Sequence, residues 1–281
     1  MSACAAVSEA GTDPQSIVEF CAAALENPDM PDAWQFNALI MSGGASHTLG
    51  DDASAVAALD RAIALRPGAP DAYRRRGLYR LAAGDADGGL ADLDRAIALN
   101  PELLEARLNR GWALADRGDW KGATADFTHA VALDPHNPRV YLARGAVAFL
   151  DGEDAHAIQN FRLAIESAPR GAPYAVVWLA LATRRSHLDD DGALAAGTAA
   201  LDLAQWPGPV VHFLAGDLSA DDLSAAAADP RQVCEAAFYT GAAFMFDGRA
   251  YEARDALTEA RTLCPDGSIE AAAATLALKK M

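Results

Sequence analysis

Small, apolar and turn-forming positions recur along the chain at a fixed interval of 34 residues. Four series share this interval and stay in one phase: Pro67, Pro101, Pro135 and Pro169; Gly43, Gly77, Gly111 and Gly145; Ala62, Ala96, Ala130 and Ala164; Leu59, Leu93, Phe127 and Phe161. Such self-similarity indicates copies of one supersecondary unit stacked on each other. The pattern predicts four regular repeats at 36–69, 70–103, 104–137 and 138–171.

Each repeat predicts two antiparallel helices. In the third repeat the first helix should cover about 104–117 and the second about 121–133, with Gly118-Asp119 in the turn. Gly111 should lie where the two helices cross, because a small residue lets the backbones approach closely. Asp134-Pro135 should end the second helix, since the residue before a proline is pushed out of the helical region.

The pattern weakens outside these repeats but remains helical. We expect a single solenoid over 14–281, composed, besides the four repeats, of a capping half repeat (14–35, with a helix over about 14–27), a degenerate helix pair (172–207, ending at Trp206-Pro207), an irregular insert (208–233, with short helices at about 210–215 and 220–227), a further repeat (234–267) and a polar capping helix (268–280). Residues 1–13 are expected to form a flexible tail. Lys279 and Lys280 suit the negative end of the last helix.

The interval and the pattern of the repeats resemble the tetratricopeptide repeat (TPR) family. The resemblance implies an all-α, right-handed solenoid of antiparallel helix pairs, whose first helices line a concave groove that binds a peptide or partner helix. The positions that would face this groove are Ile40, Arg74, Leu78, Leu108, Asn109, Trp112, Leu142 and Phe149. They are mostly apolar, unlike the lysines and asparagines of family members that grip a terminal carboxylate. The resemblance therefore favours an apolar ligand.

Two features of this groove have a second interpretation. Trp112 either contacts a partner or packs between neighbouring first helices. The Arg74, Arg75, Arg76 and Arg80 cluster either recognises an anion or is solvated and bridges acidic residues such as Asp71 or Glu105. Three adjacent arginines on a helix point in different directions, which favours solvation or bridging.

Composition and charge narrow the class of partner. The chain has 39 acidic and 23 basic residues, a formal net charge of −16, and 52% hydrophobic residues, of which many are alanine. Alanine favours closely packed helices. So negative a surface repels phosphate backbones, so we expect a protein partner rather than nucleic acid or an anionic membrane. No apolar run reaches the roughly 20 residues that would span a bilayer.

The N-terminal residues leave the compartment open between two interpretations. They lack the charged and apolar regions of a signal peptide, so the chain as it stands is expected to be cytoplasmic. Met1-Ser2-Ala3-Cys4 also resembles the end of a bacterial lipobox, and Cys4 would then be a lipidation site of a periplasmic protein. Residues 206–270 resemble bacterial NlpI-like TPR proteins, through Trp206-Pro-Gly-Pro-Val-Val, Phe213-Leu-Ala-Gly-Asp-Leu-Ser and Glu235-Ala-Ala-Phe-Tyr-Thr-Gly. This resemblance implies a periplasmic adaptor.

No motif in the chain points to catalysis, a cofactor or a metal. The six histidines form no metal-ligand spacing, and the Asp189-Asp190-Asp191-Gly192 loop lacks the alternating ligands and terminal Glu of a calcium loop. Cys234 and Cys264 should lie at the same end of one helix pair, either as buried thiols or as a disulfide that would add about 3 kcal/mol. We expect a protein-interaction scaffold. The alternative is a structural protein that self-associates through residues 208–230 as a homo-oligomer, and an enzyme is the least expected class.

Overall fold

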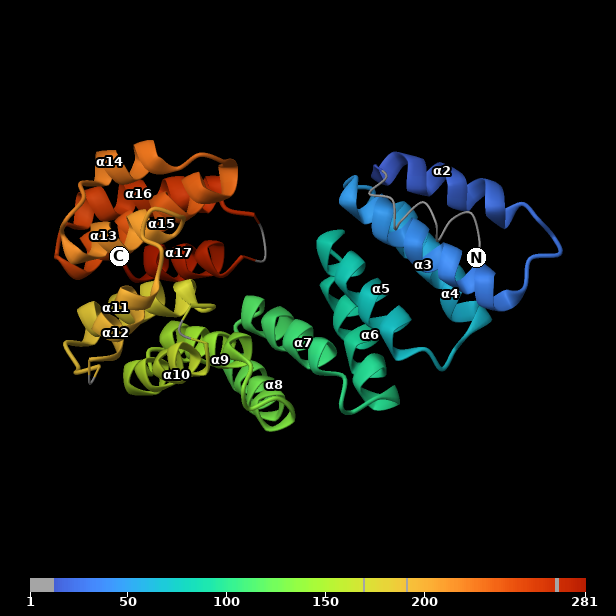
Figure 1. The fold of residues 1–281 in the computed structure, drawn as a ribbon, viewed down its shortest axis with the longest axis horizontal. Coiled ribbons are helices and arrows are strands. Elements are labelled where there is room, and N and C mark those ends of the chain that lie inside the picture. Colours follow the sequence, from blue (N-terminus) through green and yellow to red (C-terminus); the bar gives the residue numbers. More distant parts are fainter. Residues whose placement is uncertain (1–12, 169, 191, 266–267) are drawn as a thin grey trace. The chain divides into compact units, whose positions relative to one another are not determined.

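The computed structural model describes residues 13–281 apart from 169, 191 and 266–267, so Cys4 and all but the last residue of the expected tail lie outside the described residues. All regular structure in the described part is helical (Figure 1). The helices are α2 (Pro14–Leu25), α3 (Asp32–Thr48), α4 (Asp52–Leu65), α5 (Pro70–Ala82), α6 (Ala86–Leu99), α7 (Leu104–Asp116), α8 (Trp120–Leu133), α9 (Pro138–Asp151), α10 (Asp154–Ser167), α11 (Pro173–Ser186), α12 (Ala193–Ala200), α13 (Gly208–Ala215), α14 (Ala220–Ala226), α15 (Pro230–Phe246), α16 (Ala250–Leu263) and α17 (Ile269–Lys280). The predicted all-α fold of helix pairs is confirmed.

A glycine followed by an aspartate forms the turn inside several repeats. Gly84 and Gly118 adopt positive φ angles of 84° and 79°, a conformation that glycine enters without a steric penalty. The next residue, Asp85 or Asp119, then caps the second helix by accepting a hydrogen bond from a backbone N–H in its first turn. This turn explains why α7 and α8 fall within a residue of their predicted ranges.

Glycines in the first helices allow the close helix crossings that the sequence predicts. A Cβ atom at Gly77 would lie 2.9 Å from the carbonyl oxygen of Gly89 and 3.1 Å from Cγ of Leu93. A Cβ at Gly145 would lie 2.6 Å from a ring carbon of Phe161. Contacts this short do not occur between real atoms, so these positions of the repeat require glycine.

The helices group into two compact units, which we describe separately. Unit 1 comprises the residues up to Ala113 and unit 2 those from Leu114, so the boundary falls inside α7. The single solenoid over residues 14–281 stays a prediction. In unit 1, α3 packs on α4 and α5 on α6 around a core centred on Leu39, Leu59 and Tyr79.

Unit 2 has an aromatic core. The indole of Trp178 on α11 lies between the rings of Phe149, Phe161, Phe238 and Tyr239, with centroid distances of 5.3 to 6.4 Å. Edge and offset contacts of this kind are favoured between aromatic rings. They link α9, α10, α11 and α15, so the degenerate part of the sequence and the later repeat share one core.

The segment after α11 departs from the regular repeat. The second helix of this pair was expected to continue to Trp206-Pro207, but α12 ends at Ala200. The residues after it form turns instead, and the indole N–H of Trp206 donates a hydrogen bond to the Glu235 carboxylate, 2.7 Å away. The two short helices of the insert are α13 and α14. They pack in sequence between α11 and α15.

The last helix, α17, covers more of unit 2 than a terminal cap needs to. It packs on α16 and α15, as a following helix would, and it also contacts α9, the first helix of the fourth repeat. Ala273 and Ala274 are buried in these contacts. Small side chains allow this close approach, which a bulkier helix could not make.

Candidate functional site

Two of the predicted groove residues form a half-buried apolar edge in unit 1. Ile40 on α3 and Leu78 on α5 both pack against the core around Leu39 and Leu59 while keeping part of their side chains in contact with solvent. A side chain in this position can bury its remaining apolar surface only against a partner. Burial of apolar area stabilises such a contact by about 25 cal/mol per Å².

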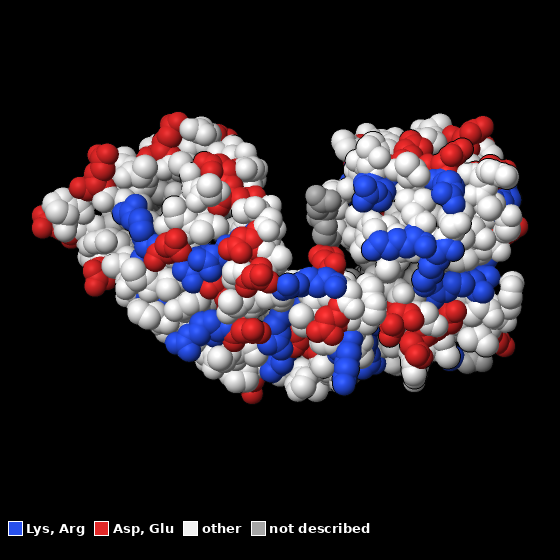
Figure 2. Space-filling model, turned by 180° about the vertical axis from the view of Figure 1, so that it is seen from behind, with Lys and Arg blue, Asp and Glu red and all other residues white. Residues whose placement is uncertain are grey.

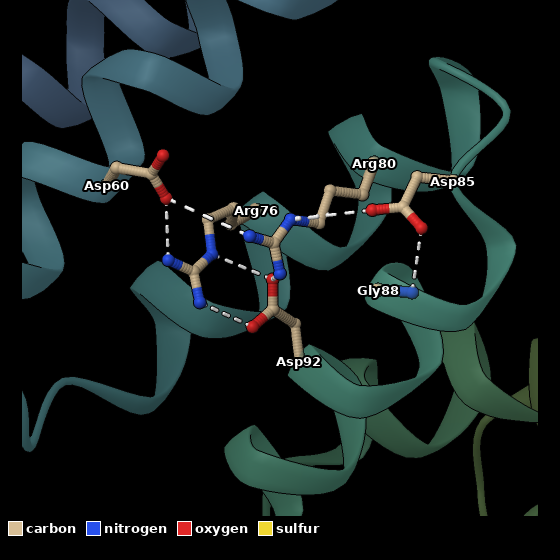
Figure 3. Close-up of polar contacts among 6 residues, drawn as sticks. All are labelled: Asp60, Arg76, Arg80, Asp85, Gly88 and Asp92. Atoms are coloured by element: carbon tan, nitrogen blue, oxygen red, sulfur yellow. Dashed lines mark hydrogen bonds and ion pairs between the residues drawn. The ribbon is translucent and has the colours of Figure 1, made fainter.

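The arginine cluster on α5 is bound to acidic residues of unit 1 (Figure 3). Arg76 donates to Asp92 on α6 through Nη2 and Nε, at 2.6 and 2.8 Å, and to Asp60 on α4 at 2.7 Å. Arg80 donates to Asp92 at 2.8 Å. The hydrogen bonds with the buried Asp92 carboxylate raise the pKa of Arg76 still further, so its charge is permanent. These two arginines therefore hold helices of neighbouring repeats together.

Arg74, the groove candidate of this cluster, also has an internal partner. The Nε groups of Arg74 and Arg75 each donate to the carboxylate of Asp71 at 2.7 Å. Burial alone would raise the pKa of Asp71, but the two arginines outweigh it and lower the pKa. The cluster therefore has the bridging role that the sequence favoured over anion recognition, with Asp71 as a foreseen partner and Asp60 and Asp92 as unforeseen ones.

The Arg76–Asp92 contact belongs to a series that the sequence analysis missed. Arg144 donates to Asn160 at 2.6 Å, and both members of this pair lie two repeats, or 68 residues, beyond Arg76 and Asp92. In the repeat between them Arg110 donates to Asp94, the equivalent of Asp60, at 2.7 Å. An arginine every 34 residues with an acid or amide 16 residues later is the signal that could have revealed the series.

The three candidates on α7 differ in exposure. Leu108 is only 3% exposed, so it has almost no surface to offer a partner, and the prediction that it lines an open groove is wrong. Trp112 is half-buried. The Nδ2 atom of Asn109 is buried and donates a hydrogen bond to none of the residues that the structure describes. An orphan donor of this kind costs about 1–3 kcal/mol unless an acceptor reaches it.

The two candidates in unit 2 lie on α9. Leu142 is half-buried, whereas Phe149 is 4% exposed. The guanidinium of Arg185 lies over the Phe149 ring, 3.5 Å from its centroid, and α17 closes the same region around a cavity of about 60 Å³. Phe149 is therefore a core residue, because α17 and α11 cover the face on which the sequence placed an open groove.

A buried carboxylate joins the conspicuous residues of the C-terminal third. Glu235 is 2% exposed and accepts hydrogen bonds from Tyr174, Trp206 and Arg231, at 3.0, 2.7 and 2.8 Å. The hydroxyl of Tyr239 donates to Glu270 on α17. Buried charge is tolerated only when it is paired in this way. Trp206 and Glu235, which belong to different motifs of the NlpI-like resemblance, are thus in direct contact, while the resemblance itself stays a prediction.

Cys234 and Cys264 are joined by a disulfide, with their Cα atoms 4.9 Å apart. The bond links the start of α15 to the residue that follows α16. It also lies directly before the segment that leads to α17, so the bond anchors the end of the helix pair against which α17 packs.

The described residues offer little for metal or membrane chemistry. No group of three His, Cys, Asp or Glu side chains among them is arranged to hold a metal ion. The carboxylate of Asp190 accepts hydrogen bonds from the backbone N–H groups of Gly192 and Leu194, which is the role of a turn residue. Among the described helices, none has the length and apolar character required to span a bilayer.

Comparisons with known proteins agree with the repeat architecture. Two family models, both described as tetratricopeptide repeat, match residues 48–103 and 90–160. No curated protein matches the chain closely enough to count as a relative.

Solved structures extend the agreement beyond the residues that these models match. A tetratricopeptide repeat protein from Parabacteroides merdae superposes with a TM-score of 0.63 over 98% of this chain and 96% of that one, at 15% identity. MamA from Desulfovibrio magneticus superposes with a TM-score of 0.52 over 58% of this chain and 90% of that one, at 20% identity. From the repeat models and the nearly full-length match of the fold, the chain is a tetratricopeptide repeat protein.

Proposed function

We propose that this protein is an interaction scaffold that holds an apolar peptide or a partner helix against the first helices of unit 1. The observation that carries the proposal is the set of half-buried apolar side chains on these helices, namely Ile40 on α3, Leu78 on α5 and Trp112 on α7. Tetratricopeptide repeats in general serve as non-enzymatic scaffolds, and we propose no reaction for this chain.

The chemistry of these side chains defines the partner. An amphipathic helix presents apolar side chains at every third or fourth position, which matches a groove lined by one apolar residue from each helix. A large aromatic ring is the residue type that most often dominates such a contact. Asn109, one turn before Trp112, can supply a hydrogen bond to a partner's backbone carbonyl, since its Nδ2 atom has no acceptor among the described residues.

Affinity capture with matched tryptophan variants tests the proposal. The wild-type chain, Trp112→Ala and Trp34→Ala are used as baits in extract of the source cell, and the captured proteins are quantified by mass spectrometry. Trp34 lies on α3 and is 46% exposed, so its removal controls for the loss of an exposed indole. We expect Trp112→Ala to lose the partners that Trp34→Ala retains, with unchanged helicity. Identical partner sets for the two variants would contradict groove binding.

A second candidate function is self-association through the insert. Short α12 leaves an apolar hollow of about 380 Å³, lined by Leu194 on α12, Val211 and Leu214 on α13, and residues of α11. A second copy of the chain could cover this hollow. Sedimentation should then show a dimer that Val211→Asp dissociates, whereas a monomer at high micromolar concentration contradicts this candidate.

The disulfide supports the periplasmic alternative over a cytoplasmic location. Disulfides persist in oxidising compartments and are rare in the cytosol. We expect the intact protein isolated from its natural compartment to gain 2 Da on reduction for the Cys234–Cys264 bond. An unchanged mass for a peptide pair containing these cysteines would indicate thiols and remove this support.

A further inference from the structure

We propose that unit 2 carries a second docking surface, between α17 and the α7–α8 turn, that binds an acidic amphipathic helix of a partner protein. This surface, which we call the α17 groove, is separate from the apolar side chains of unit 1 on which the proposed function rests. Its occupant has the opposite charge character from the chain as a whole.

The α17 groove is a hollow of about 320 Å³. One wall is a single face of α17, with residues at positions 268, 271, 272, 275, 276 and 279, which follow the three-and-four spacing of a helix. The opposite wall is the turn from Ala115 to Trp120, and Arg261 of α16 completes the lining. These side chains all belong to unit 2.

The groove is basic in an acidic protein. Arg261 and Lys279 line it, and the ion pairs found within the described residues include neither of them. This contrasts with Arg184 and Arg185 of the same unit, which pair with Asp247 and Asp154. Figure 2 shows a band of Lys and Arg side chains across the face of this unit turned to the viewer. Cations without partners, in a chain of net charge −16, favour an anionic ligand.

The one carboxylate in the lining, Asp116, opposes such a ligand only weakly. Partial loss of water raises the pKa of Asp116, which favours its neutral form. A partner carboxylate near Arg261 or Lys279 would therefore encounter two cations and one acid whose ionised form is disfavoured.

The dimensions and the apolar lining favour a helix as occupant. The α17 face runs eleven residue steps from Ser268 to Lys279, or about 17 Å, which equals about three turns of a partner helix. Ala271 and Ala272 are half-buried and small, so a partner backbone can come close. Leu276 and Trp120 add apolar surface between the two cations. An amphipathic helix with acidic residues on one side meets both requirements.

Binding of synthetic helices to the full chain tests the proposal. The probe is a labelled amphipathic peptide of about sixteen residues with a glutamate face and a leucine–alanine face, and its twin carries lysine in place of every glutamate. We expect the glutamate peptide to bind, with its anisotropy signal decreasing as salt screens the charges. The lysine twin should not bind. The double variant Arg261→Glu/Lys279→Glu should bind at least about tenfold more weakly, because it removes two charge-assisted contacts.

A variant on the same helix provides the control. Arg254 is exposed on α16 and does not line the groove, so Arg254→Glu makes a similar change in net charge at a position outside it. Affinity that falls equally in Arg254→Glu would show general electrostatic attraction and overturn the proposal. Equal binding of the two peptides, or no binding of either, would also overturn it. The same holds if duplex DNA or phosphatidylglycerol vesicles bind more tightly than the peptide through Arg261 and Lys279.

Discussion

At the scale of single residues, this fold depends on positions where a side chain is small or a charge is buried. The repeat interval allowed the sequence to place Gly43, Gly77, Gly111 and Gly145 at helix crossings, because a glycine that recurs in phase has a backbone reason. The sequence could not distinguish Gly77 from its neighbour in kind, Gly44, which makes no crossing. Only the three-dimensional contacts separate the two.

These two glycines should respond oppositely to alanine. Gly77→Ala brings Cβ to 2.9 Å from the Gly89 carbonyl oxygen, a backbone atom that cannot rotate away, so we expect a loss of about 1–3 kcal/mol in unfolding free energy. At Gly44 the nearest atom is the Tyr79 hydroxyl oxygen at 3.6 Å, so Gly44→Ala should stabilise by about 0.5–1 kcal/mol. Urea unfolding measures both, and equal effects of the two changes would contradict the crossing geometry.

Glu270 should make stability depend on pH. Burial, reinforced by the nearby Glu235 charge, raises the pKa of Glu270 to about 7 from an ordinary value of 4.5. The folded state therefore holds a proton that the unfolded state loses. Unfolding free energy should decrease as pH rises from about 4.5 to about 7, by roughly 3 kcal/mol in total, and stay low above that range.

Glu270→Gln should remove this slope, because an amide does not titrate. Arg231 and Tyr239, the other groups that face this site, keep their charge states in the same window. Glu259→Gln, an exposed change on α16, is the matched control and should leave the slope intact. Thermal melts from pH 4 to pH 8 provide the comparison. A slope that persists in Glu270→Gln would assign the titration to another residue.

At the scale of helices, local sequence rules account for most boundaries. The Gly-Asp turns and the prolines at helix starts are local signals, so α7, α8, α13, α14 and α17 lie close to their predicted ranges. The early end of α12 follows from a contact between Trp206 and Glu235, which are 29 residues apart. A periodic pattern carries no information about such a contact, and for the same reason the arginine series between helices was missed.

The helix-bridging role of Arg76 has a measurable consequence. Its side chain is 14% exposed and its partner Asp92 is 6% exposed, so Arg76→Leu leaves a buried carboxylate with only Arg80 as partner. We expect a loss of about 3 kcal/mol in unfolding free energy. Arg75→Leu on the same helix removes a more exposed pair with Asp71 and should cost less than about 1 kcal/mol. Equal costs in chemical unfolding would contradict the distinction.

At the scale of the whole molecule, the repeat array was predictable but its open surface was not. The sequence placed Phe149 in the groove by its register, and the structure buries it beneath α17, whose residues lie at least 120 positions later. Register within a repeat is a local property, whereas coverage by a distant helix is a tertiary one. The candidates Ile40, Leu78 and Trp112 in unit 1 are therefore those on which the function proposed for this chain depends.

The central claim is that unit 1 holds a partner through these side chains, and the affinity of a captured partner tests it most directly. The dissociation constant should be measured for the wild-type chain, Trp112→Ala and Trp34→Ala by calorimetry. Loss of a central aromatic anchor should weaken binding at least about thirtyfold, equivalent to about 2 kcal/mol. Trp34→Ala should change it less than about twofold. Equal dissociation constants for all three proteins would contradict the claim.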